Sequence, residues 1–298
     1  MISDNEDQQG LPMNQSSHGP SGYASASGHV KPPIANPPAT GPVDRFIRRF
    51  GAFSHAALIV LMYVLIAIAF GLALAPALWF LDQCGSLLVD VNAWLKWTAF
   101  GIACGLAFFI AGFSLLIVIP VLNFILPTRV KPFNGSYYTY SALPWYIHNG
   151  LFYVVRYTFL PFVTLTPFGD WFLRAMGMKI GKRAFLNTEF ISDPCMLSIG
   201  DDAVIGGSVH LFAHYAGGGH LIIAPTVVGA RATIGEKATL MGDVQVGEGA
   251  TVLPHSVMLP GSRVGPGEIW GGVPAVFIAP EEWQRIKDSI KRTSDNPS

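Results

Sequence analysis

Charged residues are scarce in this sequence. Only 13% of the 298 residues are Asp, Glu, Lys or Arg, about half the share found in ordinary soluble domains. Hydrophobic residues make up 51%, and the mean hydropathy is +0.41. This composition argues against an ordinary soluble globule. Because 19 basic residues balance 19 acidic ones, no excess positive charge is available to attract nucleic acid, and we expect no nucleic-acid partner.

Cysteine is also scarce. The three cysteines, Cys84, Cys104 and Cys195, are scattered and form no CxxC pair. This pattern excludes a disulfide framework and a zinc cage, and it fits a reducing compartment. We expect no metal site, and we expect Cys195 to be a structural residue rather than a nucleophile.

The N-terminal residues 1–44 contain almost no large aliphatic side chains, as in the stretch PPIANPPATGP. Such a segment buries too little apolar surface to offset the entropy of ordering it. The composition predicts a disordered polar tail.

Two long uncharged runs follow, over residues 56–81 and 98–126. Each is longer than the roughly 20 residues that cross the hydrocarbon layer as a helix. Residues 45–130 are therefore predicted to form a transmembrane helical hairpin. Three small residues of the second run are expected to let the helices approach closely: Gly101, Gly105 and Gly112.

Basic residues flank this hairpin. Arg45, Arg48 and Arg49 precede it, and Arg129 and Lys131 follow it. Since positive charge is concentrated on the cytoplasmic side of membrane proteins, both ends are predicted to lie in the cytoplasm.

An aromatic and apolar segment occupies residues 131–178. Arg156, Pro161 and Pro167 interrupt it and argue against a third clean span. We expect it to lie at the membrane interface, with four aromatic residues at headgroup depth: Trp145, Tyr146, Tyr153 and Tyr157. A third, tilted span remains an alternative, and it would place the rest of the chain on the far side.

An aliphatic residue returns at every sixth position in the C-terminal third, at Val228, Ile234, Leu240, Val246, Val252, Met258 and Val264. A small or compact residue stands two positions before most of them, and glycine often follows. This hexapeptide period is typical of a parallel β-helix, in which three short strands form each triangular coil. The glycines are expected at corners, where they tolerate unusual backbone angles. About five coils are predicted within residues 179–278, followed by a short helix and tail over residues 279–298.

The period breaks at the stretch LFAHYAGGGHLII, which begins at Leu211. With His210 directly before it, three histidines, His210, His214 and His220, fall within eleven residues. Histidine is the side chain best suited to exchange a proton near neutral pH. Each histidine alone could be an ordinary polar loop residue, but the group favours a functional site.

The repeat, the histidine-bearing excursion and the ending Trp270-Gly271-Gly272-Val273-Pro274-Ala275 resemble the hexapeptide-repeat acyltransferases. This family implies a left-handed β-helix, acyl-coenzyme A as co-substrate with no tightly bound cofactor, and a homotrimer. The stretch TPFGDWFLRAMGMKIGK over residues 166–182 is more closely similar to membrane-attached repeat units at the C-terminal end of ε-poly-lysine-type synthetases. The expected fold is thus a membrane-anchored helical hairpin followed by a left-handed parallel β-helix.

The resemblance also implies site residues. His214, which stands fifteen residues before Gly229, matches the family's general base, and His220 is the second catalytic candidate. Three residues are expected to contact the coenzyme: Gly272, Pro274 and Ala275. The family's basic residue after Pro-Ala is replaced here by Val276 and Phe277. Whether an acidic or a carbonyl group orients His214 stays open; Asp193, Asp201 and Asp202 lie early in the coil region.

We therefore expect an acyltransferase that moves an acyl group, acetyl first, from acyl-coenzyme A to a hydroxyl or amine of an envelope glycan, lipid-linked precursor or peptide. The resemblance implies a bacterial inner-membrane protein with its β-helix in the cytoplasm. Two alternatives remain: an amide-bond-forming partner of a carrier-protein-dependent peptide synthetase, and a non-catalytic trimeric membrane scaffold. A zinc carbonic anhydrase on the same coil is disfavoured, because the histidines share one excursion.

Overall fold

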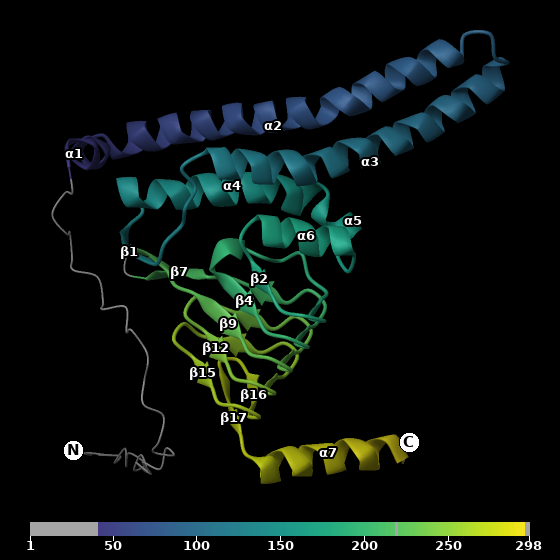
Figure 1. Ribbon diagram of the computed structural model, residues 1–298. Helices are drawn as coiled ribbons and strands as arrows, with labels where there is room; N and C mark the ends of the chain where they lie inside the picture. The colour runs from purple at the N-terminus through teal and green to yellow at the C-terminus, as the bar shows by residue number, and fades with distance from the viewer. Residues whose placement is uncertain (1–40, 218–219, 296–298) are drawn as a thin grey trace, which may run out of the picture. The chain divides into compact units, whose positions relative to one another are not determined.

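The computed structural model describes residues 41–217 and 220–295 (Figure 1). Most of the predicted polar tail, residues 1–44, lies outside this part of the chain. Its last residues enter helix α1 (Pro42–Arg49), which begins at a proline because the first helical position needs no backbone donor.

Two long helices form the hairpin. Helix α2 (Gly51–Leu87) and helix α3 (Ala93–Ile125) lie side by side, as Figure 1 shows. The Asn92 side chain caps α3 by accepting a hydrogen bond from the Trp94 amide at 3.0 Å. Both helices are long and apolar enough to cross a membrane. They bury alanines at intervals of four residues: Ala69, Ala73 and Ala77 in α2, and Ala103 and Ala107 in α3.

The glycines of α3 differ from the expectation. A Cβ atom on Gly101 or Gly105 would meet nothing within 4 Å, so the α2–α3 approach does not depend on them. A Cβ on Gly112 would overlap the ring of Phe159, which is 1% exposed. Gly112 therefore permits a close approach between α3 and the segment after α4.

Short elements occupy residues 131–178. They are strand β1 (Phe133–Ser136), the 3-10 turn η1 (Tyr140–Ala142) and helices α4 (Leu143–Thr158), α5 (Leu160–Val163) and α6 (Pro167–Ala175). Helix α4 contacts α2 and α3, and its Leu151, Phe152 and Val155 are fully buried. Among the described helices only α2 and α3 qualify as candidate membrane spans.

Three parallel sheets form the β-helix, and their strands are stacked in Figure 1. The first sheet contains β2 (Lys179–Ile180), β4 (Leu197–Ile199), β9 (Thr226–Val228), β12 (Gln245–Val246) and β15 (Arg263–Val264). The second contains β3 (Phe185–Leu186), β5 (Val204–Ile205), β10 (Thr233–Ile234), β13 (Thr251–Val252) and β16 (Ile269–Gly272). The third contains β6 (His210–Leu211), β11 (Thr239–Leu240) and β14 (Val257–Met258). The predicted parallel β-helix is confirmed.

The period-six residues line its interior. Ile234, Leu240, Val252 and Met258 are 0% exposed, and each registers with an aliphatic residue of the neighbouring coil, as Ile234 does with Val252. The interior is narrow, and only small side chains such as Ala232 fit beside them, also fully buried. The left-handed sense of the coil remains an expectation from the family resemblance.

The coil glycines fall into two groups. Left-handed corner angles are found at Gly249, Gly261 and Gly267, as expected, and also at non-glycine residues such as Arg231 and His255. A second group, which follows the period-six aliphatic residues, has another role. A Cβ on Gly229 would lie 2.7 Å from the Glu248 nitrogen, and a Cβ on Gly247 would lie 2.6 Å from the Pro266 nitrogen. These glycines are required because the backbone of the next coil passes too close for a side chain.

The β-helix ends in an antiparallel pair. Strand β17 (Ala275–Ile278) turns back on β16, and helix α7 (Pro280–Asp295) follows. At the other end, helix α6 contacts β2. One continuous cluster of buried residues runs from Ala73 and Leu116 of the hairpin through Phe152 to Val252. The hairpin, the short helices and the coils therefore share a core.

Candidate functional site

The histidine-bearing excursion is a β-hairpin that leaves the coil after β6. Its strands β7 (His214–Gly217) and β8 (His220–Ile223) are antiparallel, and β8 also pairs with β1. The hydroxyl of buried Thr226 lies at the base of the hairpin, within hydrogen-bond distance of the Phe212 carbonyl at 2.8 Å and the Met241 carbonyl at 3.0 Å, and can donate to either of them. The excursion is thus anchored on a rigid scaffold.

Alternation along the strand sets the direction of its side chains. Leu211 and Ala213 are fully buried, so His210, Phe212 and His214 lie on the opposite, outer face. Their rings follow one another, with centroids 5.8 Å apart for His210–Phe212 and 5.9 Å apart for Phe212–His214. The outer face therefore carries a row of aromatic and imidazole rings that ends at His214.

Asp193 is the partner of His214. The His214 Nδ1 and Asp193 Oδ2 atoms are 2.6 Å apart. Asp193 is 0% exposed and adopts a left-handed backbone conformation just before the 3-10 turn η2 (Pro194–Met196). Non-glycine residues in this conformation are uncommon, and here it places the carboxylate beneath the first residue of the hairpin.

Helix α4 supplies the other partners of this carboxylate. Trp145 Nε1 donates to Asp193 Oδ1 at 2.6 Å, and Asn149 Nδ2 donates to the same oxygen at 2.7 Å. The Ala213 amide donates to Oδ2 at 3.1 Å, and the Asp193 amide donates to Asn149 Oδ1 at 3.0 Å. Asp193 is held rigidly, because donors surround both of its oxygens.

These contacts decide the protonation of the pair. Burial alone would raise the pKa of Asp193, but the hydrogen bond and charge of His214, with the Asn149 and Trp145 donors, outweigh burial and lower it. An ionised carboxylate only accepts hydrogen bonds, so His214 Nδ1 must carry the proton in their shared bond. In the neutral form of the imidazole, His214 Nε2 then carries the lone pair, on a side chain that is 26% exposed. The arrangement is that of a general base held by a carboxylate.

The other candidate acids lie elsewhere. Asp201 accepts the Lys182 amide at 2.7 Å, and Asp202 forms an exposed ion pair with Arg183 at 2.6 Å. Both sit at coil corners. Of the three acids left open by the sequence, Asp193 is the one in contact with His214.

His220 lies at the far end of the hairpin. In the β7–β8 register His214 faces Ile223, whereas His220 faces Gly217 and also pairs with Ser136. Three residues separate the two positions along the strand, about 10 Å. The structure does not bring His220 to the Asp193–His214 pair, and its catalytic role remains a sequence-based prediction.

The predicted coenzyme residues lie at the final hairpin. The exposed Gly272 closes β16, and its amide donates to the buried Ser256 hydroxyl at 3.2 Å. Pro274 and Ala275 begin the return strand. Strand β16 belongs to the third coil after the one that contains β6. The final hairpin therefore lies about 14 Å along the stack from the coil that carries the excursion.

Cys195 is close to the Asp193–His214 pair, but its thiol is a weak nucleophile. Burial, followed by the nearby Asp193 charge, raises the pKa of its thiol to about 12. A thiol that stays protonated is a weak nucleophile. In the described residues no group of three or more His, Cys, Asp or Glu could hold a metal ion.

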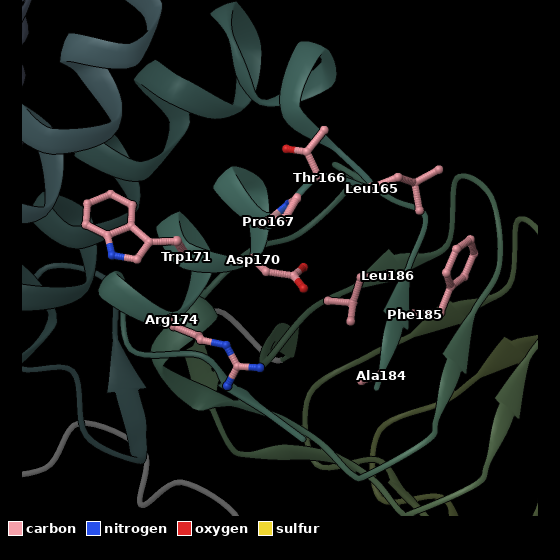
Figure 2. Close-up of a pocket in the computed structure, with 9 residues that line it drawn as sticks. All are labelled: Leu165, Thr166, Pro167, Asp170, Trp171, Arg174, Ala184, Phe185 and Leu186. Atoms are coloured by element: carbon pink, nitrogen blue, oxygen red, sulfur yellow. The ribbon is translucent and has the colours of Figure 1, made fainter. Parts of the chain in front are cut away.

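A cavity of about 460 Å³ lies between α6 and β3 (Figure 2). Leu165, Trp171 and Phe185 are among its lining residues, with Asp170 and Arg174 as the ionisable ones. Burial raises the pKa of Asp170 although Arg174 opposes it. None of the predicted site residues lines this cavity.

Two curated proteins are similar to this chain in sequence. No family model matches. The chain is 26% identical over 183 residues to the Delta-poly-L-ornithine synthetase of Acinetobacter baumannii, covering 59% of this chain but only 13% of the synthetase. It is 27% identical over 170 residues to the candidate acetyltransferase YvoF of Bacillus subtilis, covering 53% of this chain and 93% of YvoF.

Solved structures of the same repeat type are also similar. The hexapeptide-repeat acetyltransferase VCA0836 of Vibrio cholerae matches with a TM-score of 0.32 and 23% identity, over 35% of this chain and 63% of that one. A maltose O-acetyltransferase of Clostridium difficile matches with a TM-score of 0.34 and 17% identity, over 40% and 81%. The two sequence relatives confirm the predicted resemblance to hexapeptide-repeat acyltransferases and its link to poly-amino-acid synthetases.

Sequence reasoning missed Trp145 and Asn149. Both stand in the segment expected at the membrane interface, and no motif marks them. The structure gives Trp145 and Tyr153 protein partners, Asp193 and Ser192, whereas Tyr157 is 69% exposed. The available signal was weak: α4 presents polar and aromatic residues at positions 145, 149 and 153, which share one face of a helix.

Proposed function

We propose that this chain is a membrane-anchored acyltransferase that moves an acyl group, acetyl first, from acyl-coenzyme A to a hydroxyl or amine. An envelope glycan, a lipid-linked precursor or a peptide would carry the acceptor group. The observation that carries the proposal is the Asp193–His214 pair at 2.6 Å, standing where an excursion leaves a hexapeptide-repeat β-helix. The acetyltransferase relative supports the enzyme class.

The reaction needs one base and a place for developing charge. The acceptor oxygen or nitrogen attacks the thioester carbonyl while His214 Nε2 removes its proton, and Asp193 stabilises the resulting imidazolium. The tetrahedral intermediate then collapses. Its C–S bond breaks, and the leaving thiolate takes the proton from His214, so that the products are the acylated acceptor and free coenzyme A. A backbone amide of a coil turn would stabilise the oxyanion.

The coenzyme would extend from His214 towards the final hairpin. Gly272, Pro274 and Ala275 are the proposed contacts there, and the exposure of Val273, 73%, leaves this turn open to a long ligand. In a homotrimer, the assembly proposed from the family resemblance, the turn of one subunit and the excursion of its neighbour would border a shared groove.

Membrane anchoring rests on the hairpin. Only 11% of the most apolar window of α2 is buried, and 33% of that of α3. Side chains such as Leu78, Trp79 and Phe124 are 61%, 69% and 89% exposed. Apolar surface of this extent is unusual on a soluble monomer. We place the hairpin in a bacterial inner membrane and, from the flanking arginines, the β-helix in the cytoplasm.

A donor and acceptor screen tests the proposal. Detergent-solubilised protein is mixed with acetyl-coenzyme A and a panel of amines and hydroxyl compounds, and free thiol is measured. His214→Asn is expected to abolish acceptor-dependent thiol release. The matched control His255→Asn changes an exposed histidine at a coil corner and is expected to leave the rate unchanged. Full activity in His214→Asn would overturn the mechanism.

A second function is favoured by one observation, the match to the poly-ornithine synthetase. In that case the chain would join carrier-bound amino acids through amide bonds, with the same histidine deprotonating the attacking amine. The donor separates the two functions. An acyltransferase of the first kind accepts acetyl-coenzyme A, whereas the amide-forming partner accepts only a thioester on a carrier protein.

A further inference from the structure

A buried arginine lies beside the proposed catalytic pair. Arg156 of helix α4 is only 7% exposed. It follows Asn149 and Tyr153 at spacings of seven and three residues, so the three side chains share one face of the helix. Asn149 binds Asp193 at 2.7 Å, Tyr153 binds the Ser192 hydroxyl at 2.7 Å, and Arg156 donates to that same hydroxyl at 3.3 Å.

The charge of Arg156 has little compensation. Aromatic rings surround its guanidinium, with centroids 5.2 Å away for Tyr153, 5.0 Å for Tyr157 and 5.8 Å for Phe190. Within residues 41–217 and 220–295 no carboxylate lies within ion-pair distance of it. A guanidinium has five N–H donors, and Ser192 is their hydrogen-bond partner in the described chain. A buried cation is costly unless paired, and cation–π contacts offset only part of that cost.

Contacts link this cation to the segment that carries the Asp193–His214 pair. Its hydrogen-bond partner Ser192 directly precedes Asp193, which holds His214. On the outer face, Phe190 beneath the guanidinium contacts the His210 ring at 4.8 Å, and His210 begins the ring row that ends at His214. Burial, followed by the charge of Arg156, lowers the pKa of His210 although Glu189 opposes this. A chain of ring contacts therefore connects Arg156 to the row that ends at His214.

We propose that Arg156 binds the anionic group of the acyl acceptor, a carboxylate or a phosphate, and so presents the acceptor's amine or hydroxyl to His214. This inference rests on the proposed function and names its substrate class: acceptors that carry an oxyanion as well as a nucleophile. Arginine suits this task, because its planar fork binds two oxygens at once and stacks on aromatic faces. Lysine would keep the charge and lose both properties.

Calorimetric titration of the detergent-solubilised full chain tests this site without requiring turnover. The probes are L-ornithine, chosen from the relative's name, its amide L-ornithinamide, and inorganic phosphate. We expect the acid to bind at least about tenfold more tightly than the amide, because only the acid has a carboxylate for the guanidinium. If the natural anion is a phosphate, inorganic phosphate binds and the acid and amide are equal.

The variants use matched chemistry. Arg156→Gln is expected to reduce binding of the preferred anion to the level of the neutral amide, and Arg156→Lys is expected to retain part of it. Arg183→Gln makes the same change at an exposed arginine, 74% accessible and paired with Asp202, and is expected to bind as the wild type. The comparison of acid, amide and phosphate on the unmodified protein remains decisive even if Arg156→Gln does not fold.

Two results overturn the site. In the first, phosphate does not bind and L-ornithine binds no more tightly than L-ornithinamide. In the second, Arg156→Lys and Arg156→Gln bind the preferred anion as tightly as the wild type. Failure of the proposed function is seen separately. If anions bind through Arg156 but no thiol is released from any acyl donor, the anion site stands and the acyltransferase assignment falls. If transfer proceeds without preference for anionic acceptors and without dependence on Arg156, the acyltransferase assignment stands and the anion site falls.

Discussion

The regular coils and the segment around His214 are encoded in opposite ways. In the coils each interior position is repeated, so that Ile234 and Val252 occupy equivalent sites, register with each other and are equally buried. Around the excursion, Asp193, His214 and Asn149 come from three separate segments, and in the described part of the chain no second His–Asp pair is found in the coils. The fold is therefore specified by a pattern that recurs in every coil, whereas the site is specified by residues that occur only once. Substitutions in the coils should change stability, whereas substitutions around His214 should change chemistry.

The largest effect is expected from Asp193→Asn. An asparagine of nearly the same shape can donate its amide hydrogen to His214 Nδ1, which shifts the ring proton to Nε2 and removes the lone pair that acts as base. We expect kcat for acyl transfer to fall by about 10² to 10⁴ with the binding of acyl-coenzyme A unchanged. Steady-state thiol release and calorimetry measure the two quantities.

The matched control is Asp202→Asn, which changes an exposed carboxylate on a coil corner. Its transfer rate should equal that of the wild type. If Asp193→Asn kept the wild-type kcat, the carboxylate would not orient the base. The claim that substitutions around His214 change chemistry would then be wrong.

The next effect concerns stability. Ile234 is 0% exposed and lies inside the third coil, so Ile234→Ala should lower the free energy of unfolding by about 2–5 kcal/mol through lost burial and a cavity. Thermal or denaturant unfolding in detergent measures it. Thr233→Ala, at the exposed neighbouring position, should change stability little. A folded Ile234→Ala protein that loses kcat as strongly as Asp193→Asn would contradict the separation of fold and chemistry.

This contrast explains what the sequence could predict. The period of six identifies residues such as Leu240 and Met258 as interior, because geometry forces the same choice in every coil. It cannot identify Trp145 or Asn149, which act at one point through hydrogen bonds to a carboxylate 44 to 48 residues away. Asp193 was one of three candidate acids, and only the turn of the chain at η2 distinguishes it from Asp201 and Asp202.

The helical part was predicted by length and hydropathy rather than by packing. Two long apolar runs sufficed to predict α2 and α3, but not which small residues would be in contact. Gly101, Gly105 and Gly112 are indistinguishable in the sequence, but of the three only Gly112 contacts a buried ring. The family resemblance favours His214 as the base, with His220 as the second candidate. In the structure only His214 contacts Asp193, whereas His220 pairs with Gly217 at the far end of the hairpin.

Helix α4 offers a pH test of the same contrast, since its two faces differ. His148, next to Asn149 but directed at α3, is 1% exposed, and its Nδ1 lies 2.9 Å from Asn123 Oδ1. Burial lowers its pKa from 6.5 to about 4, against the attraction of Asp193. Between these values the unfolded chain binds a proton that the folded chain does not, so stability is full above about pH 6.5 and falls as the pH drops towards 4.

The expected loss is about 3 kcal/mol over that window. It is measured as the difference between the unfolding free energies of the wild type and His148→Asn at each pH, which cancels the titration of carboxylates common to both. His255→Asn, at an exposed site, should retain the wild-type pH dependence. Parallel pH curves for the wild type and His148→Asn would show that the buried imidazole does not titrate in this way.

The smallest effect is expected from Trp145→Phe, and it tests how finely the site is tuned. Phenylalanine keeps a ring against His214, whose centroid lies 5.1 Å from that of Trp145, but loses the Nε1 donor to Asp193. Asn149 and the Ala213 amide still hold the carboxylate, so kcat should fall only about tenfold, the effect of one charge-assisted hydrogen bond. Trp97→Phe, on a 70% exposed residue of the hairpin, should leave kcat unchanged. A loss of kcat as large as that of Asp193→Asn would mean that the indole alone orients the carboxylate. An unchanged kcat would mean that the Trp145 donor contributes to packing rather than to catalysis, and the site would then consist of Asp193 and His214.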